Sequence, residues 1–403
     1  MNIVMISPGL PMEQAYFTRA LAQVGATVIG IGDQPLHDLP VEAQRHLRHY
    51  EHVSLADEGA VLAALSGLSL HARIDQVECL WEPYVVLAAR VREHLGLPGM
   101  PVEQAVAFRD KERMKQVLDA AGIRTPRHAG ASTVQQVWEA AERIGYPLIV
   151  KPIAGAGSAD TFRIDSADEL ADVLPMVRHV PTLSIEEFID GEEFTYDTVC
   201  GAGNVLFENI SWYRPRPLQQ RSHEWISPMT VALRHPDDDW LAGGLAMGRD
   251  VLRALGFHAG FTHMEWYRKA DGEVVFGEIG ARPPGARTVD VMNYATDGDL
   301  FRAWAEAVTT GTTAPLIHRF NAASIFKRAQ GSGRITRVEG LQPLLAEYGD
   351  SVCVVNLLPI GAHRRDWRAT LLSDGMIIVR HPELATMLEI GDHFATDLHL
   401  YAG

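Results

Sequence analysis

The sequence predicts a mixed α/β protein in which an α/β region is followed by a strand-rich α+β region. Short apolar runs alternate with segments of helical periodicity through residues 1–100. A Gly/Pro-rich break, Gly96–Pro101, then interrupts the pattern. After Ser184 strands dominate, and the chain is long enough for about two to four compact modules.

The N-terminal region reads as a βαβ unit. Ile3–Ile6 is a short apolar run, Met12–Val24 has helical periodicity, and Ala26–Ile31 is a second apolar run. This order predicts a parallel sheet, and Gln76–Leu80 and Val85–Leu95 continue the alternation. Since no G-x-G-x-x-G follows the first strand, the dinucleotide fingerprint is absent.

The middle and C-terminal regions carry fewer long helices. We expect helices at Phe108–Ala121 and Val134–Ile144, a short strand at Leu148–Lys151, and later long helices only near Trp240–Leu255 and Gly298–Thr309. From residue 321 onward, short apolar runs with Gly and Pro punctuation predict a small β-rich C-terminal module.

Composition excludes several classes of partner. The net charge of −15 argues against nucleic acid, because phosphate binding needs a basic face. The three cysteines, Cys79, Cys200 and Cys353, lie far apart without metal-ligand spacing and suit a reducing cytoplasm. We find neither a signal peptide pattern nor an apolar run long enough to cross a bilayer, so we expect a cytoplasmic protein without a membrane partner.

Two carboxylates stand at corresponding places of two adjacent apolar-alternating runs. Glu265 ends one run, Glu278 ends the next, and the turn Lys269–Gly272 joins them. Close carboxylates repel, and a hard cation such as Mg²⁺ is their simplest shared partner. With Arg282 following, the segment predicts a metal–nucleotide site; the alternative is a solvated hairpin with incidental acids.

A lysine followed by a loop of small residues forms a second motif. Lys151 ends an apolar strand, and residues 154–160 include Gly155, Gly157 and Ser158. Small residues let backbone N–H groups approach phosphate closely, so we expect a phosphate-binding lid here. A snorkelling lysine and an ordinary flexible turn are the alternatives.

Two further segments complete the series. Arg109–Lys115 opens a helix, with Asp110 as the expected N-cap. Ser184–Thr195 runs from a strand through an extended segment into another strand. Extended backbone can offer C=O and N–H groups to an adenine edge, and an acid several residues later can accept hydrogen bonds from ribose. The alternative is a hairpin with charged surface residues.

The order of these motifs, between about Pro101 and Val308, resembles that of the ATP-grasp superfamily. Within it, the chain is most similar to carboxylate–amine ligases of the amino-acid and dipeptide ligase type, with a biotin-carboxylase-like architecture. The resemblance implies a Rossmann-like pre-ATP-grasp domain, two ATP-grasp lobes with the nucleotide between them, and the β-rich module, over residues 1–100, 101–183, 184–315 and 316–403.

The resemblance also assigns roles. The residues that would bind the nucleotide are Lys111, Lys151, Gly155, Gly157, Ser158, Glu186, Glu187, Ile189 and Glu193. Within this set, the lysines neutralise phosphates, Glu186 and the backbone of Glu187 and Ile189 read adenine, and Glu193 holds the ribose. Glu265 and Glu278 bind Mg²⁺, with Mn²⁺ as an alternative metal. Arg282, together with Lys151, is the catalytic residue and stabilises the transferred phosphoryl group.

One position departs from the family pattern. The second acid strand of the family usually reads Glu-x-Asn, whereas this chain has Gly280 at the third place. The change puts a second metal ion in doubt. Water, Asp290 or Asn293 would have to replace the missing side chain.

The substrate end is less defined. Arg287 shares a Gly/Pro-rich turn with Arg282, which suits it to anion recognition. The alternative is that Arg287 is a solvent-exposed loop residue. His263 shares a strand face with Glu265, so it lies near the metal site or is a packed core histidine. The aromatic and basic insertion at residues 211–226 gates the site or forms a homodimer contact.

These features predict an ADP-forming ligase acting on small molecules. ATP would phosphorylate a carboxylate, and an amine or thiol would attack the acyl-phosphate. One alternative is a bicarbonate-activating carboxylase or purine-pathway enzyme of the same superfamily. Another is a nucleotide-binding regulatory protein with a decayed site, which Gly280 favours and the retained lysines, acids and Arg282 disfavour.

Overall fold

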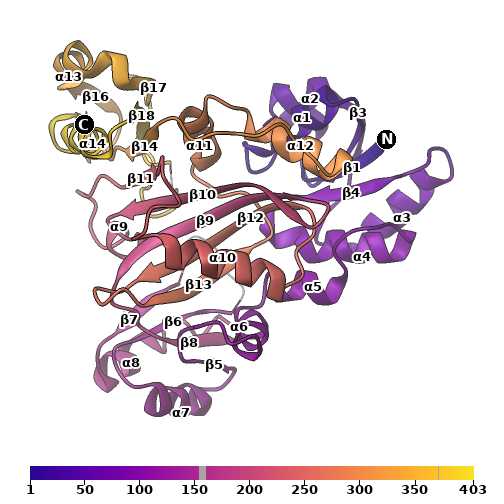
Figure 1. Cartoon of the computed structure of the whole chain (residues 1–403), viewed down its shortest axis with the longest axis horizontal. Helices are drawn as coiled ribbons and strands as arrows, with labels where there is room; N and C mark the ends of the chain where they lie inside the picture. The colour runs from indigo at the N-terminus through magenta and orange to yellow at the C-terminus, as the bar shows by residue number, and fades with distance from the viewer. Residues whose placement is uncertain (154–159, 371) are drawn as a thin grey trace.

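The structure is a computed structural model that describes residues 1–153, 160–370 and 372–403. In these residues, strands form four sheets (Figure 1). A central cleft is lined by residues from the N-terminal, middle and C-terminal parts of the chain. No helix of the described residues is long and apolar enough to span a bilayer.

The N-terminal unit contains the predicted parallel sheet. Its strand order is β3-β2-β1-β4, and β1 pairs in parallel with both β2 and β4. The strands are β1 (Asn2–Ile6), β2 (Thr27–Gly32), β3 (Leu47–His52) and β4 (Gln76–Cys79). The helices are α1 (Gln14–Gln23), α2 (Val41–His46), α3 (Glu58–Ser69) and α4 (Val85–Leu95), with short 3₁₀ turns at Leu36–Asp38 and Glu82–Tyr84. Since β4 runs into the second turn, it carries Glu82 to the cleft.

The second unit is an antiparallel sheet with the order β5-β8-β6-β7. Its strands are β5 (His128–Ala131), β6 (Leu148–Pro152), β7 (Phe162–Ile164) and β8 (Leu183–Glu187), and its helices are α7 (Val134–Ile144) and α8 (Ala167–Val173). The helix predicted at Phe108–Ala121 starts too early. α5 (Val102–Ala107) ends first, and α6 (Lys111–Ala120) begins after Asp110, whose carboxylate accepts hydrogen bonds from two backbone N–H groups of the first turn.

An eight-stranded sheet forms the centre of the molecule, with the order β13-β12-β9-β10-β11-β14-β18-β17 (Figure 1). Its strands are β9 (Glu192–Gly201), β10 (Asn204–Arg214), β11 (Met229–Ala232), β12 (Gly260–Arg268), β13 (Val274–Gly280), β14 (Asn321–Phe326), β17 (Val352–Leu357) and β18 (Gly375–His381). The sheet therefore continues across the expected boundary at residues 315 and 316. The four-part division of the chain stays a prediction.

Helices pack closely on this sheet. They are α10 (Ala242–Ala254), α11 (Thr288–Thr296) and α12 (Leu300–Thr310), and the two predicted long helices correspond to α10 and α12. The short helix α9 (Pro217–Gln220) lies between β10 and β11 in the chain. A Cβ atom at Gly244 would lie 2.2 Å from the buried Trp266 ring. The absence of a side chain at Gly244 therefore lets α10 approach β12 closely.

Strands and helices share the C-terminal part. A three-stranded sheet contains β15 (Gln330–Gly331), β16 (Ile335–Glu339) and β19 (His399–Ala402). Two helices that the sequence interpretation did not include lie beside it, α13 (Leu341–Tyr348) and α14 (Leu384–Asp397), with a 3₁₀ turn at Gly349–Ser351. The loop of residues 358–374 between β17 and β18 reaches the central cleft.

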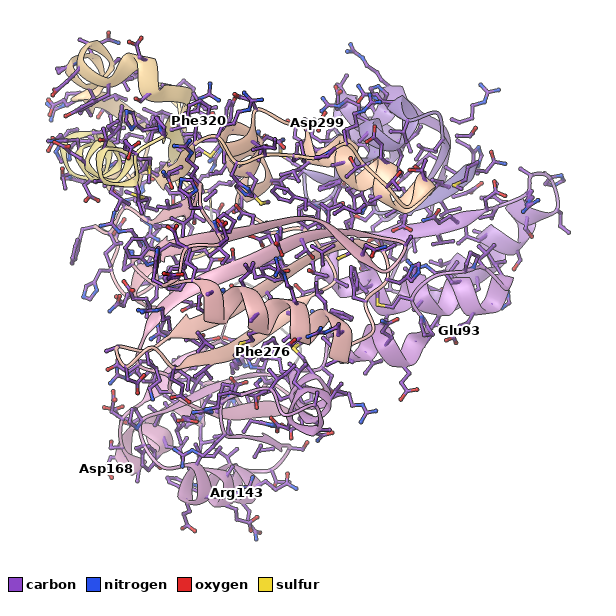
Figure 2. All side chains as sticks on the ribbon, viewed as in Figure 1. Glu93, Arg143, Asp168, Phe276, Asp299 and Phe320 are labelled. Atoms are coloured by element: carbon purple, nitrogen blue, oxygen red, sulfur yellow. The ribbon has the colours of Figure 1, made fainter. Side chains whose placement is uncertain are left out.

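The second unit joins the central sheet at a narrow junction. Phe276 of β13 is buried near this junction (Figure 2), and its N–H donates to Arg124 O at 2.9 Å. The Arg124 side chain contacts Glu187, at the end of β8, and Glu273, in the β12–β13 turn. One arginine thus links the two sheets that flank the cleft.

Candidate functional site

A cavity of about 700 Å³ occupies the central cleft. Segments far apart in the chain form its walls, from the N-terminal unit to the loop of residues 358–374. Nearly all of the predicted site residues that the structure describes line it: Lys111, Lys151, Glu186, Glu187, Ile189, Glu193, His263, Glu265, Glu278 and Arg282. Gly155, Gly157, Ser158 and the predicted lid, except Asp160, lie outside the described residues.

The two acids of the predicted hairpin face each other. Glu265 of β12 and Glu278 of β13 are direct cross-strand partners. Tyr213 Oη donates to Glu265 Oε1 at 3.4 Å, and Lys111 Nζ lies 3.1 Å from Glu278 Oε2. Burial alone would raise the pKa of the Glu278 carboxyl, but Lys111 and Lys151 lower it to about 2. Glu278 is therefore ionised at neutral pH.

The carboxylate of Glu186 is engaged by two lysines and a serine. Its Oε1 accepts hydrogen bonds from Lys115 Nζ at 2.7 Å and Ser184 Oγ at 2.8 Å, and its Oε2 lies 3.0 Å from Lys151 Nζ. Burial would raise the pKa of Glu186, yet the two lysines hold it below the ordinary value. The predicted adenine role of this side chain stays a prediction, and in the structure its carboxylate holds two lysines in place.

Lys115 is a site residue that the sequence interpretation missed. Its side chain is fully buried, and it lies one helical turn after Lys111 on α6. Lysines at positions i and i+4 share a helix face, and this spacing was a signal that could have indicated a pair. Burial lowers the pKa of Lys115, and its ion pair with Glu186 opposes that effect.

Lys151 stands between two acids. Its Nζ lies 3.0 Å from Glu186 Oε2 and 3.7 Å from Glu278 Oε2. Burial alone would lower the pKa of Lys151, but both carboxylates raise it above the ordinary value. The ammonium therefore remains charged beside the facing acids, a suitable state for binding an anion.

An arginine of the insertion at residues 211–226 braces the segment between β8 and β9. Arg216 Nη1 donates to Ile189 O at 2.9 Å, and its Nε lies 3.4 Å from Glu193 Oε2. Its guanidinium also lies over the rings of Phe188 and Tyr267, at 4.9 and 5.0 Å from their centres. No local sequence pattern indicated this role. Arg216 connects the two places where adenine and ribose contacts were predicted.

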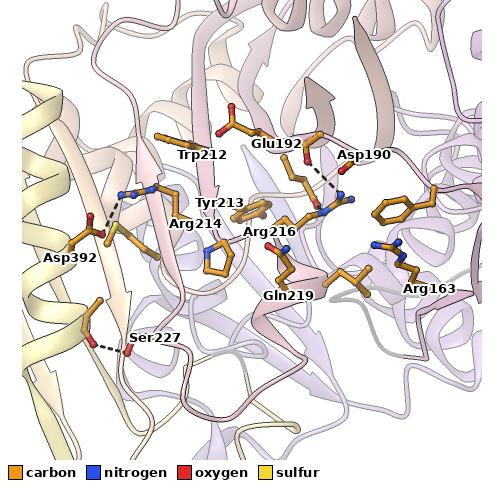
Figure 3. Close-up of a pocket in the computed structure, with 17 residues that line it drawn as sticks. Arg163, Asp190, Glu192, Trp212, Tyr213, Arg214, Arg216, Gln219, Ser227 and Asp392 are labelled. Carbon is orange, nitrogen blue, oxygen red and sulfur yellow. Dashed lines mark hydrogen bonds and ion pairs between the residues drawn. The ribbon is translucent and has the colours of Figure 1, made fainter. Parts of the chain in front are cut away.

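Figure 3 shows a neighbouring pocket of about 500 Å³, with Arg216 in its wall. Glu193, Tyr213 and Arg216 line both this pocket and the main cavity. In this view Arg216 contacts the turn between Asp190 and Glu192 through Gly191 O at 3.4 Å. Arg216 therefore forms part of the partition between the two pockets.

The side chain of Glu187 has a structural role. Its carboxylate accepts hydrogen bonds from the Arg124 guanidinium at 3.2 Å and from Arg127 N at 3.1 Å. The predicted nucleotide contact through the backbone of Glu187 remains compatible with this arrangement. The side chain itself fixes the end of β8 against the central sheet.

Arg282 pairs with an acid from the N-terminal unit. Its Nε donates to Glu82 Oε2 at 2.6 Å, and Glu82 also pairs with Arg109. Glu82 lies 200 positions from Arg282, and no local pattern indicated the contact. Burial would raise the pKa of Glu82, but Arg282 and Arg109 hold it below the ordinary value. Arg282 is thus held at the cavity wall.

The departure at Gly280 has a structural counterpart. A Cβ atom there would lie 3.2 Å from Arg282 Cγ, so Arg282 lies against the position of the missing side chain. The two residues considered as replacements make other contacts. Asp290 accepts two hydrogen bonds from Arg287, and Asn293 Oδ1 accepts one from Leu300 N. Neither of them lines the cavity.

The two substrate candidates have different surroundings. His263 lines the cavity, and its Nδ1 lies 2.6 Å from Asp197 Oδ1. Burial lowers the pKa of His263, but Asp197 raises it to about 9. Arg287 instead pairs with Asp290, lies 5.5 Å from the ring centre of Tyr16, and does not line the cavity. The structure does not bring Arg287 into the site.

The family described as an ATP-grasp domain matches residues 108–211. The chain contains an ATP-grasp domain. Its matched region starts three residues before Lys111 and includes Lys151, Glu186 and Glu193. The predicted resemblance to the ATP-grasp superfamily is thus confirmed over residues 108–211.

Curated relatives include ligases. The chain is 28% identical over 246 residues to an L-arginine-specific L-amino acid ligase of Bacillus subtilis. This match covers 58% of this chain and 59% of that protein. It is 31% identical over 172 residues to a D-alanine–D-alanine ligase of Pseudomonas putida (strain GB-1), covering 37% and 54%. The chain thus spans little more than half the length of these relatives.

Solved structures extend the likeness to the whole fold. The crystal structure of an L-amino acid ligase from Bacillus licheniformis superimposes with a TM-score of 0.77 at 22% identity, covering 100% of this chain and 98% of that one. N5-carboxyaminoimidazole ribonucleotide synthetase from Thermotoga maritima gives a TM-score of 0.72 at 15% identity, covering 100% and 99%. The predicted multi-domain ATP-grasp fold is confirmed.

Replacing Lys151 with Ala should weaken binding of a non-hydrolysable ATP analogue by about tenfold or more, because a charged donor is lost from the ATP-grasp cleft. Titration calorimetry with Mg²⁺ present measures the change. Lys269→Ala is the matched control, since Lys269 pairs with Glu273 in the β12–β13 turn, outside the cavity. Parent-like affinity and turnover in Lys151→Ala would contradict the assignment.

Replacing Arg216 with Gln should shift the pH dependence of ATP affinity to higher pH. Burial and the nearby Glu265 raise the pKa of Glu193 to about 8, and Arg216 opposes this rise. Without Arg216 the pKa of Glu193 rises further, so less carboxylate is available at pH 7 to accept hydrogen bonds from ribose. We expect about tenfold weaker ATP binding at pH 7 and partial recovery as the pH rises above 8.

The control for Arg216 is Arg163→Gln. Arg163 also lies over the Phe188 ring, at 4.2 Å from its centre, but pairs with Asp165 and not with Glu193. ATP affinity should be measured in both variants between pH 6.5 and 9. An equal loss in the two variants, or a loss in Arg216→Gln that does not change with pH, would show that Arg216 does not act through Glu193.

Proposed function

We propose that this protein is an ADP-forming ligase that uses ATP to activate a small carboxylate as an acyl-phosphate for attack by an amine. The observation that carries the proposal is the meeting of Glu265 and Glu278 with Lys111, Lys151 and Arg282 in one cavity. Phosphoryl transfer depends mostly on positioning and charge neutralisation, which these groups supply. The amino-acid ligase relatives support the same reaction class.

The acids fit a divalent cation. Glu265 and Glu278 offer oxygen ligands from facing strand positions. Burial, and after it the charge of Glu265, raises the pKa of Glu193, so a third carboxylate lies within electrostatic reach of Glu265. We therefore propose that Glu265 and Glu278 hold Mg²⁺ or Mn²⁺. The bound ion would neutralise charge on the transferring phosphoryl group.

The remaining side chains have separate tasks in this reaction. Lys111 and Lys151 offset phosphate charge, and Glu193 accepts hydrogen bonds from ribose. A carboxylate oxygen of the substrate attacks the γ-phosphorus, and ADP leaves. The amine then attacks the acyl carbon, and inorganic phosphate leaves. Arg282 stabilises negative charge on the phosphoryl group during the first step and on the acyl-phosphate before the second.

A bicarbonate-activating enzyme is the second candidate, because the structure also superimposes on N5-carboxyaminoimidazole ribonucleotide synthetases at 15% identity. Release of ADP and phosphate should be measured with pooled carboxylic acids and amino acids in bicarbonate-free buffer, and then with bicarbonate added. ADP release that requires an organic acid and an amine supports the proposal. ADP release that requires bicarbonate would replace it with the second candidate, and no substrate-dependent ADP release would favour a regulatory nucleotide-binding protein.

A further inference from the structure

Three arginines line the end of the cavity formed by the C-terminal part of the chain. Arg221 directly follows α9, Arg328 lies two residues after β14, and Arg368 belongs to the loop of residues 358–374. We call Arg221, Arg328 and Arg368 the arginine cluster. Trp367 organises it, since the guanidinium carbons of Arg328 and Arg368 lie 4.6 and 5.1 Å from the centre of its ring.

The arginine cluster has no carboxylate partner in the part of the chain that the structure describes. Arg328 Nη1 donates to the backbone oxygens of Gln220 and His223, both at 2.9 Å, but its buried Nε has no hydrogen-bond partner. Arg216 and Arg282, in contrast, face Glu193 and Glu82. Arginines that line the cavity without a paired carboxylate are therefore found, among the described residues, at this end of the cleft.

Nearby acids are engaged by another arginine. Glu224 and Asp374 both pair with Arg364, and Asp374 also accepts a hydrogen bond from Ala329 N at 2.8 Å. Burial, and then the charge of Arg221, lower the pKa of Arg328 to about 10. Glu224 and Asp374 offset this shift only in part, and no ion pair of the described residues joins either of them to the cluster.

The acids that line the cavity come from other segments: Glu13, Glu82, Glu186, Glu187, Glu193, Glu265 and Glu278. The cavity consequently has an acidic side near the metal–nucleotide residues and a basic side at the arginine cluster, in a chain whose net charge is −15. A substrate that spans the cavity meets both sides. Attraction of anions to this chain is therefore a local property of the cluster and not of the protein as a whole.

We propose that the arginine cluster binds a side-chain anionic group, a carboxylate or a phosphate, that an amino-acid substrate carries in addition to its α-carboxylate. This proposal rests on the proposed ligase function. Planar guanidinium groups pair bidentately with both kinds of anion, and a partly buried site strengthens such contacts. The substrate class is accordingly an acidic or phosphorylated amino compound, in preference to a neutral amino acid.

Titration calorimetry on the full chain, saturated with a non-hydrolysable ATP analogue and Mg²⁺, tests this. The probes are L-glutamate and O-phospho-L-serine, and their neutral counterparts are L-glutamine and L-serine. We expect at least one anionic probe to bind about tenfold or more tightly than its counterpart. The two pairs also distinguish a carboxylate from a phosphate as the recognised group. Equal affinities within both pairs would overturn the proposal.

Variants locate the effect. Arg221→Gln and Arg368→Gln should each lower the affinity for the anionic probe by about tenfold. Neither side chain pairs with a carboxylate of the described residues, so each change removes a donor without freeing a protein acid. Arg319→Gln is the matched control, because Arg319 is exposed and does not line the cavity. If Arg221→Gln and Arg368→Gln weaken the ATP analogue as much as the probe, the arginine cluster serves the nucleotide and the proposal is wrong.

The same experiment separates the two hypotheses. Failure of the ligase proposal shows as absence of analogue binding, or as no ADP formation with any acid and amine in parallel assays. Failure of the anion proposal shows as an unchanged preference between charged and neutral probes while analogue binding is intact.

Discussion

Replacing Glu278 with Gln should abolish metal-dependent ADP formation at ordinary Mg²⁺ concentrations. The amide removes one of two facing carboxylates and leaves Lys111 Nζ, 3.1 Å from this position, without its charged partner. Mg²⁺ prefers anionic oxygen ligands and keeps few protein contacts, so the loss of one charge should shift the required Mg²⁺ concentration upward by about tenfold or more. Glu265→Gln should have the same effect, because Glu265 lies directly opposite in register.

The matched control is Glu273→Gln. Glu273 belongs to the same hairpin but pairs with Arg124 and Lys269, outside the cavity. ADP formation should be measured over a Mg²⁺ titration for all three variants, with thermal unfolding to confirm that each is folded. Parent-like Mg²⁺ dependence in both Glu265→Gln and Glu278→Gln would exclude the proposed metal site.

Replacing Arg282 with Met should leave nucleotide affinity nearly intact and slow the reaction strongly. In the absence of ligand, Arg282 faces Glu82, an acid of the N-terminal unit, at 2.6 Å. An interaction made mainly in the transition state lowers kcat when it is removed, with little change in ground-state binding. We expect ATP affinity to change by about 1 kcal/mol or less. Single-turnover ADP formation should fall by about a hundredfold or more.

Two controls accompany this variant. Arg268→Met removes an arginine from the end of β12 that does not line the cavity, so ATP affinity and rate should both stay near those of the parent. Glu82→Gln removes the partner of Arg282 and tests whether the pair positions the guanidinium. If Arg282→Met loses affinity and rate in equal proportion, Arg282 has a ground-state binding role and not a role in the transition state.

The hairpin was predictable because its cause is local. The turn Lys269–Gly272 and the alternation of the two runs set the register, and the register sets Glu265 opposite Glu278. Lys151 was predictable for a similar reason, since a charged residue at the end of a buried strand needs a partner. The start of α6 was visible in Asp110, although the helical pattern was extended too far toward Phe108.

The missed parts of the site depend on contacts between distant segments. Lys115 meets Glu186 across 71 positions, and Glu82 meets Arg282 across 200. Neither side chain belongs to a local pattern that indicates its partner. The arginine cluster is a further case, because three separate segments bring its members together. Side-chain pairing of this kind depends on the tertiary arrangement, which one sequence does not specify.

The eight-stranded sheet has a mechanical consequence. Glu265 and Glu278 stand on its first two strands, and the loop of Arg368 is anchored on its last two, so one continuous hydrogen-bonded ladder holds the metal residues and the anion-binding end at constant separation. Lys151 and Glu186 belong to a different sheet, which Arg124 ties to the first. Lys151 therefore meets Glu278 across a junction between two sheets that side-chain contacts join, whereas Glu265 and Glu278 meet through strand pairing within one sheet.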